Sequence, residues 1–291
     1  MLTGSIVALV TPFTSQGNVD FTHLEGLVNW HVEQGTDAIV AMGTTGESAT
    51  MSHDEHVMVV SAISELAAGR IDVIAGNGSN STSEAVHLTE RMTHLPLAGF
   101  LNVNPYYNNP SQRGLMAHYR ACCDASDLPQ LLYNVPSRTG ADLQPEQVAE
   151  LATLPNIVGI KEATGDLTRV AKLRELCGDE FILLSGDDPS GCKFMLQGGH
   201  GVISVTANVM PAVMKKMVSA AVAGDADQAY AYDQQIASVH AAMFVQANPI
   251  PVKWALSLMD KLQPYYRLPM TEPELAQQHH IEQTLKQAGL I

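Results

Sequence analysis

Short apolar segments recur along the chain, and each is followed by a polar loop and a stretch with helical features. Most of these segments are continuously apolar, which is typical of parallel strands covered on both faces. We expect strands at Ser5–Val10, Ala38–Ala41, Val73–Ala75, Gly99–Val103, Gln130–Val135, Ile157–Ile160, Phe181–Leu184 and Gly201–Val205. Eight strand–helix units in one chain predict an α/β fold, a closed (β/α)8 TIM barrel.

Several helical stretches carry start signals. Ser52–Glu55 and Ser81–Glu84 have the spacing of capping boxes, in which serine and glutamate satisfy backbone N–H groups of the first turn. Asp188-Pro189 predicts a helix that begins there with proline in its first turn. The rival architecture is an open, doubly wound sheet, but no GxGxxG pattern follows the first strand.

The length of 291 residues suits one domain, because an α/β barrel takes about 250 residues. We expect a single domain over residues 1–291, with the barrel at about 1–224 and a C-terminal helical extension at about 225–291. The N-terminus has no basic region followed by a cleavage pattern, and no run of about 18 apolar residues occurs. We therefore expect neither a signal peptide nor a membrane span.

The net charge and the cysteine spacing limit the classes of partner and site that we expect. The net charge of −14 argues against nucleic-acid binding through phosphate contacts. An acidic substrate would need local cations in its binding site. The cysteines form no CxxC pair, which suits neither a zinc site nor a disulfide framework and favours a reducing cytoplasm.

Active sites of such barrels lie at the C-terminal ends of the strands. Lys161, the first lysine in the chain, directly follows the apolar run Ile157–Ile160 and should end the sixth strand. Poor solvation there would favour the neutral amine, the form that attacks a carbonyl carbon. The alternative is a lysine that reaches solvent or pairs with Glu162. Other lysines, including Lys193 and Lys253, lie in helical stretches, and we expect them to be ordinary surface or helix-end residues.

An amine that attacks a carbonyl carbon can form an imine, or Schiff base. This reaction requires proton transfers at the amine and at the departing oxygen, and hydroxyl groups at the same end of the barrel could carry them. Tyr133 ends the fifth strand, next to the strand of Lys161. Thr44 and Thr45 follow the second strand in a glycine-bounded loop, and Tyr107 follows the fourth. Each could be a packing residue with one solvated end. Together they predict a site for a small 2-oxo acid such as pyruvate.

Metal and nucleotide chemistry is not expected. His53 and His56 have i,i+3 spacing at a helix start, which is more typical of surface histidines than of metal ligands. Gly76–Ser79 is glycine-rich but fits neither a Walker nor a dinucleotide motif. We expect no metal, no nucleotide and no organic cofactor.

Three motifs in register match one enzyme superfamily. They are Gly43-Thr-Thr-Gly-Glu47, Tyr133-Asn-Val-Pro-Ser-Arg-Thr-Gly140 and Gly159-Ile-Lys-Glu-Ala163, and the match extends to Val10–Phe13 and Asn248–Trp254. The chain therefore resembles the dihydrodipicolinate synthase and N-acetylneuraminate lyase superfamily over most of its length.

Arg138 distinguishes the branches of this superfamily. In the synthases the matching arginine binds the carboxylate of L-aspartate 4-semialdehyde, and a guanidinium offers a two-pronged fork to a carboxylate. The alternative role is a loop-stabilising ion pair. Arg138 favours a synthase over a neuraminate-type lyase or a sugar-acid aldolase. A non-catalytic binding protein on the same barrel would lack the nucleophilic lysine or the hydroxyl groups that relay its protons. Lys161, Tyr133 and Thr44 are all present here, which argues against this alternative.

The resemblance implies a lyase that condenses pyruvate with L-aspartate 4-semialdehyde to give 4-hydroxy-tetrahydrodipicolinate, in diaminopimelate and lysine biosynthesis. The implied site consists of the nucleophile Lys161, the acid/base Tyr133, the relay hydroxyls of Thr44 and Tyr107, and the pyruvate-site residues Thr45, Gly186 and Ile203. In the family the residue matching Tyr107 reaches the partner subunit's site. A homodimer, paired into a homotetramer, is therefore implied.

The resemblance also implies feedback inhibition by L-lysine, which the sensitive synthases bind at a dimer interface. The matching residues here are Ser48, Ala49, His53, His56, Gly78, Asn80, Glu84 and Tyr106. Glu84 suits an ammonium group, and Asn80 and Tyr106 suit a carboxylate. The alternative is that Glu84 only caps a helix and that the histidines are solvated.

Overall fold

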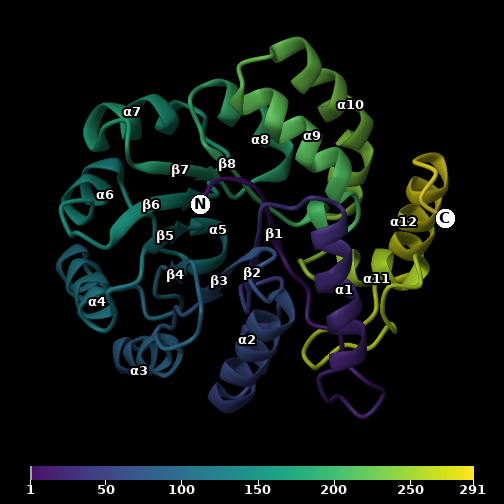
Figure 1. The fold of residues 1–291 in the computed structure, drawn as a ribbon, viewed down its shortest axis with the longest axis horizontal. Helices are drawn as coiled ribbons and strands as arrows, with labels where there is room; N and C mark the ends of the chain where they lie inside the picture. Colours follow the sequence, from purple (N-terminus) through teal and green to yellow (C-terminus); the bar gives the residue numbers. More distant parts are fainter. Residues whose placement is uncertain (1) are drawn as a thin grey trace.

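The computed structural model describes residues 2–291 and contains a closed barrel of eight parallel strands in chain order, with β8 paired to β1. The strands are β1 (Gly4–Ala8), β2 (Ala38–Ala41), β3 (Asp72–Gly76), β4 (Gly99–Val103), β5 (Gln130–Asn134), β6 (Ile157–Glu162), β7 (Ile182–Ser185) and β8 (Gly201–Ser204). All eight predicted strands are confirmed, and their ends differ from the predicted ends by at most two residues. The predicted barrel is therefore correct (Figure 1).

Helices surround this barrel (Figure 1). They are α1 (Phe21–Glu33), η1 (Ser48–Thr50), α2 (His53–Ala67), α3 (Thr82–Met92), α4 (Gln112–Asp124), α5 (Pro136–Thr139), α6 (Pro145–Leu151), α7 (Thr168–Cys177), α8 (Asp188–Leu196), η2 (Thr206–Asn208) and α9 (Pro211–Val222). Three further helices form the expected C-terminal segment: α10 (Ala226–Ala242), α11 (Ile250–Leu258) and α12 (Leu275–Gln287). Among residues 2–291, no helix is long and apolar enough to cross a membrane.

Side chains alternate between the inside and the outside of the barrel, as the strand geometry requires. Ile6, Val40, Ile74, Leu101 and Ile203 belong to one interior cluster. Their neighbours in the sequence, such as Val7 and Ile39, pack in a larger cluster that includes helical side chains. Two-sided burial explains why the strands are continuously apolar in sequence.

One of the two predicted capping boxes is present. Ser52 accepts a hydrogen bond from the backbone N–H of Glu55, and Glu55 accepts one from the backbone N–H of Ser52. The prediction for Ser81 is wrong, because its side chain makes no capping bond. The Glu84 carboxylate instead accepts a hydrogen bond from Ser79, which removes it from the capping role.

The helix predicted at Asp188-Pro189 is α8, with proline in its first turn. The preceding residue, Asp187, is its N-cap and accepts a hydrogen bond from the backbone N–H of Ser190. The carboxylate of Asp188 accepts hydrogen bonds from the backbone N–H groups of Val205 and Thr206. These bonds hold the residues that follow β8 against the C-terminal end of β7.

Candidate active site

Strands β5 and β6 place Tyr133 directly opposite Lys161 in parallel register. Residues paired in this way point to the same face of a sheet, here the interior of the barrel. The Lys161 amine nitrogen lies 4.1 Å from the centre of the Tyr133 ring. Both side chains are buried at the C-terminal end of the barrel. The aromatic ring therefore forms one wall of the environment of the amine.

A cavity of about 200 Å³ opens above this pair of residues. Its wall contains six of the predicted catalytic and substrate residues: Thr44, Thr45, Tyr133, Arg138, Lys161 and Gly186. The volume lies below the ~300 Å³ at which drug-sized ligand sites begin, so it suits a small metabolite. The structure thus brings residues that follow β2, β5 and β7 together with Tyr133 of β5 and Lys161 of β6 in one small site.

Gly186 borders the lysine side chain closely. A Cβ atom built at this position would lie 2.9 Å from Lys161 Cε and 2.7 Å from the Cβ of Ala163. Both distances are too short for a real Cβ atom without movement of its neighbours. The absence of a side chain at Gly186 therefore leaves the space that Lys161 occupies.

The loop after β2 carries Thr44 and Thr45. The Thr45 hydroxyl, which is buried, accepts a hydrogen bond of 2.9 Å from the Asn248 amide, so its proton remains available to a ligand. The carbonyl of Gly46 accepts a hydrogen bond of 2.7 Å from the Thr11 hydroxyl. The loop is thereby fastened to the segment after β1 and to the turn before α11.

Sequence analysis missed a buried ion pair behind this loop. Lys253, predicted to be an ordinary helix residue, has a side chain with no exposed surface and contacts the Glu47 carboxylate at 2.6 Å. Its amine also lies 4.1 Å from the centre of the Phe13 ring. Burial raises the pKa of Glu47 and lowers that of Lys253, while the attraction between the two groups opposes both shifts. The prediction for Lys253 was wrong because α11 packs against the loop of Glu47.

Arg138 lies on the short helix α5 at the mouth of the cavity. Among residues 2–291 its side chain forms no ion pair, and the guanidinium donates a hydrogen bond of 3.4 Å to the Asn248 carbonyl. The alternative of a loop-stabilising ion pair is therefore not supported. The guanidinium is free to bind an anion that enters the cavity.

Two predicted residues lie outside the cavity wall. Ile203 on β8 is buried in the interior cluster that also contains Tyr133 and Leu184, so it supports the wall from below. Tyr107 is 94% exposed and does not reach the cavity of its own chain. Its backbone has φ = 74°, a left-handed conformation that is strained for a tyrosine.

A second cavity of about 430 Å³ adjoins the first. Seven of the eight residues predicted to bind lysine line it: Ser48, Ala49, His53, His56, Gly78, Glu84 and Tyr106. Asn80 is not part of its wall in a single chain, and its carbonyl accepts a hydrogen bond from Asn108. Thr44, Val135, Arg138 and Asn248 border both cavities.

The polar groups of this second cavity differ in their environments. The Glu84 carboxylate lies 4.0 Å from a ring nitrogen of His53, and both side chains are partly exposed. His56 is buried and bonds to the Gly76 carbonyl at 2.7 Å, so the expectation of two surface histidines is wrong for His56. Burial lowers the pKa of His56 to about 4, which leaves the ring neutral near pH 7.

No cluster of His, Cys, Asp or Glu side chains among residues 2–291 has the arrangement of a metal site.

Comparison with known proteins identifies the family of this chain. The model of the dihydrodipicolinate synthetase family matches residues 1–288. The chain belongs to this family. It is therefore an enzyme, a lyase of the family.

Individual relatives agree with this assignment. The 4-hydroxy-tetrahydrodipicolinate synthase of Idiomarina loihiensis is 62% identical, with 100% of this chain and 98% of the relative covered. The crystal structure of the chloride-inhibited dihydrodipicolinate synthase of Acinetobacter baumannii complexed with pyruvate superposes with a TM-score of 0.98, at 46% identity and 100% coverage of both chains.

A second solved structure is the synthase of Cyanidioschyzon merolae with lysine bound. It has a TM-score of 0.96, is 40% identical and covers 99% of each chain. The names of these relatives favour the synthase interpretation over a neuraminate-type lyase or a sugar-acid aldolase.

Proposed function

We propose that this chain condenses pyruvate with L-aspartate 4-semialdehyde through a Schiff base on Lys161 and releases 4-hydroxy-tetrahydrodipicolinate, a step of diaminopimelate and lysine biosynthesis. The observation that carries the proposal is the buried Lys161 amine, 4.1 Å from the Tyr133 ring at the base of a small cavity. An amine of this kind attacks carbonyl carbons. The family assignment supports the same substrates.

In the first step the Lys161 amine attacks C2 of pyruvate, and the carbinolamine loses its oxygen as water to give the imine. Tyr133 acts as the acid and base at the amine and the departing oxygen. Thr45 holds the pyruvate carboxylate through its hydroxyl, whose oxygen is already occupied as an acceptor by Asn248. Gly186 leaves room in the wall for the Lys161 side chain, and Ile203 packs in the interior cluster behind that wall.

In the second step a proton leaves the pyruvyl methyl group to give the enamine, which attacks the aldehyde carbon. The amine of the second substrate then displaces Lys161 from the imine and closes the ring, so one water is lost overall. Arg138 binds the carboxylate of the semialdehyde with its guanidinium, which has a 3.4 Å hydrogen bond to the Asn248 carbonyl and no ion pair among residues 2–291. Its position at the cavity mouth suits the substrate that enters second.

Thr44 belongs to the hydroxyl relay that transfers protons, and Tyr107 from a second copy of the chain completes this relay. The 94% exposure and strained backbone of Tyr107 favour a role at an interface, since such strain persists where function requires it. We accordingly propose a homodimer that pairs into a homotetramer. Free cysteines and the biosynthetic role of the family favour a cytoplasmic location.

The 430 Å³ cavity is proposed as a site for L-lysine as feedback inhibitor. Glu84 and the neutral His56 suit ammonium groups, and Tyr106 suits the carboxylate. Asn80 would join from its place beside the cavity. Ser48, Ala49, His53 and Gly78 complete the wall. Lysine bound to the Cyanidioschyzon merolae relative supports this choice of ligand.

A substrate panel tests the function. Pyruvate with L-aspartate 4-semialdehyde should yield a product whose mass is the sum of the substrates minus one water. Pyruvate with N-acetylmannosamine should yield no condensation product. Arg138→Ala should weaken the response to the semialdehyde and leave pyruvate adduct formation intact, because it removes a charge-assisted contact to the second substrate. Condensation of pyruvate with N-acetylmannosamine but not with the semialdehyde would instead support the lyase alternative.

A further inference from the structure

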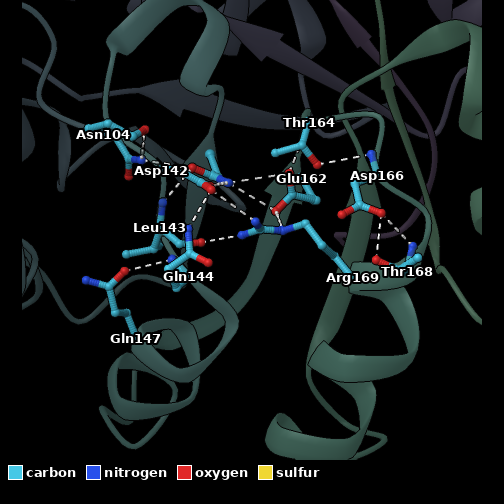
Figure 2. Close-up of polar contacts among 12 residues, drawn as sticks. Asn104, Asp142, Leu143, Gln144, Gln147, Glu162, Thr164, Asp166, Thr168 and Arg169 are labelled. Atoms are coloured by element: carbon cyan, nitrogen blue, oxygen red, sulfur yellow. Dashed lines mark hydrogen bonds and ion pairs between the residues drawn. The ribbon is translucent and has the colours of Figure 1, made fainter.

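A buried polar cluster lies on the outer face of the barrel, directly behind Tyr133 and Lys161. Its centre is formed by the next residues in the chain, Asn134 and Glu162, which are themselves paired in register. Successive side chains of a strand point to opposite faces, so these two point away from the catalytic cavity. Arg169 from α7 reaches toward Glu162, Asp142 and Leu143 (Figure 2).

The carboxylate of Glu162 is held from several directions. It forms an ion pair of 3.0 Å with the Arg169 Nε, and it accepts hydrogen bonds from the Asn134 amide at 3.2 Å and from the Thr164 backbone N–H at 2.8 Å. The side chains of Glu162 and Arg169 are only 2% and 9% exposed. Buried charges with so many partners hold a fixed geometry, because loss of one partner leaves another charge uncompensated.

Asn134 extends the cluster to β4. Its side-chain oxygen accepts hydrogen bonds of 3.0 Å from the Asn104 amide and from the Leu143 backbone N–H. Its own amide donates to Asp142 at 2.8 Å as well as to Glu162. The Asn104 backbone N–H in turn donates to the Tyr133 carbonyl at 3.1 Å. The cluster therefore joins the C-terminal ends of β4, β5 and β6.

The ladder between β5 and β6 is interrupted below this point. Gln130 pairs with Ile157, but Leu131 pairs with Gly159, so β6 contains one additional residue at the interruption. Only the register above the interruption places Tyr133 opposite Lys161. A slip of one residue would turn one of these side chains to the opposite face of the barrel.

We propose that Asn134, Glu162 and Arg169 are positioning residues for imine formation, which lock the register that holds the Tyr133 hydroxyl and the Lys161 amine in one geometry. This inference rests on the proposed Schiff-base function. None of the three side chains lines the catalytic cavity, so they act through the backbone of β5 and β6. Their loss should therefore slow the reaction of bound pyruvate more than it weakens pyruvate binding.

The test compares two arginines of the same helix. Arg174 on α7 donates hydrogen bonds to the carbonyls of Gly178, Phe181 and Gly198, at the opposite end of the barrel. Arg169→Lys and Arg174→Lys both keep the charge and lose the fork-shaped donor set. The time course of imine formation with pyruvate is followed by quenching with borohydride, and the unfolding temperature of each variant is measured alongside.

Arg169→Lys and Glu162→Leu should lower the rate of imine formation at saturating pyruvate by ~10–100-fold, as expected for a misplacement transmitted from outside the site. The pyruvate concentration at half-saturation should change by less than about threefold, because the carboxylate-binding loop after β2 is untouched. Glu162→Gln, which keeps an acceptor for Thr164, should recover most of the rate. Arg174→Lys should form the imine at the wild-type rate, even if its unfolding temperature falls as much as that of Arg169→Lys.

The inference would be overturned if Arg169→Lys formed the imine at the wild-type rate. It would also be overturned if Arg169→Lys and Arg174→Lys slowed imine formation by the same factor. If Glu162→Leu does not fold, the comparison of the two arginine variants decides the question alone. A wild-type chain that forms no adduct with pyruvate would contradict the proposed function instead.

Discussion

The Lys161 amine lies 4.1 Å from the centre of the Tyr133 ring because β5 and β6 pair these two residues in register. The contact places a phenol beside the Lys161 amine in a buried environment. Packing alone would need only the ring, whereas proton transfer at the carbinolamine needs the hydroxyl group.

Tyr133→Phe separates these two roles, since it keeps the ring and removes only the hydroxyl. We expect the rate of imine formation with pyruvate to fall by roughly 10²–10⁴-fold, the usual contribution of a general acid or base. Thermal unfolding measured in parallel should show a near-native midpoint. A phenylalanine variant that forms the imine at the wild-type rate would exclude Tyr133 as the acid/base.

Gly186→Ala tests the space around the Lys161 side chain. The added methyl group would lie 2.9 Å from Lys161 Cε, so the lysine side chain must move away from position 186 and lose its present position. We expect pyruvate trapping to slow by at least ~10-fold, with destabilisation of about 1–3 kcal/mol from overpacking. Gly114→Ala on α4 is a suitable control, because its nearest contact would be 3.5 Å. Unimpaired trapping in Gly186→Ala would show that the glycine is not required for the site.

L-lysine at millimolar concentration should inhibit the condensation, and Glu84→Gln should relieve the inhibition. Coupling between sites usually amounts to about 1–3 kcal/mol, so the expected change in apparent pyruvate affinity or rate is of order 5–150-fold. The catalytic cavity does not include Glu84, so imine formation without lysine should stay normal. Inhibition that persists in a Glu84→Gln, His56→Gln double variant would place the lysine site elsewhere.

Buried histidines predict a loss of stability in mild acid. Burial lowers the pKa of His31 from 6.5 to about 3, so the folded chain keeps this ring neutral while the unfolded chain binds a proton below pH 6.5. The contribution of His31 to stability is complete above pH 6.5 and is lost as the pH falls toward its folded pKa.

Urea unfolding at fixed protein concentration measures this effect. Between pH 7 and pH 5 the wild type should lose roughly 2 kcal/mol through His31, at 1.36 kcal/mol for each pH unit below 6.5. His31→Gln should lose about that much less over the same interval. Parallel pH dependences in the two proteins would mean that His31 does not stay neutral when folded.

The barrel and the place of Lys161 at a strand end could be predicted because both depend on local sequence. Each strand is a continuous apolar run, and the rule that sites lie at C-terminal strand ends leads directly to Lys161. The prediction for Lys253 failed because its partner Glu47 lies 206 residues away in the chain. No local pattern distinguishes a buried lysine of α11 from an exposed one.

The same reason explains the other differences. Glu84 has capping-box spacing with Ser81, but a loop conformation brings Ser79 to its carboxylate. The Arg169 side chain reaches Glu162 only after α7 folds back on the barrel, so its charge looks like that of any helix arginine in sequence. Periodicity predicts elements, whereas ion pairs between elements depend on the tertiary arrangement.

The central claim is tested most directly by mass spectrometry after borohydride treatment in the presence of pyruvate. The account predicts one reduced pyruvyl group per chain, on the peptide that contains Lys161. It also predicts no adduct in Lys161→Ala and an unchanged adduct in Lys172→Ala, whose lysine is exposed on α7. An adduct on another lysine, or trapping that survives Lys161→Ala, would contradict the assignment of Lys161 as the nucleophile.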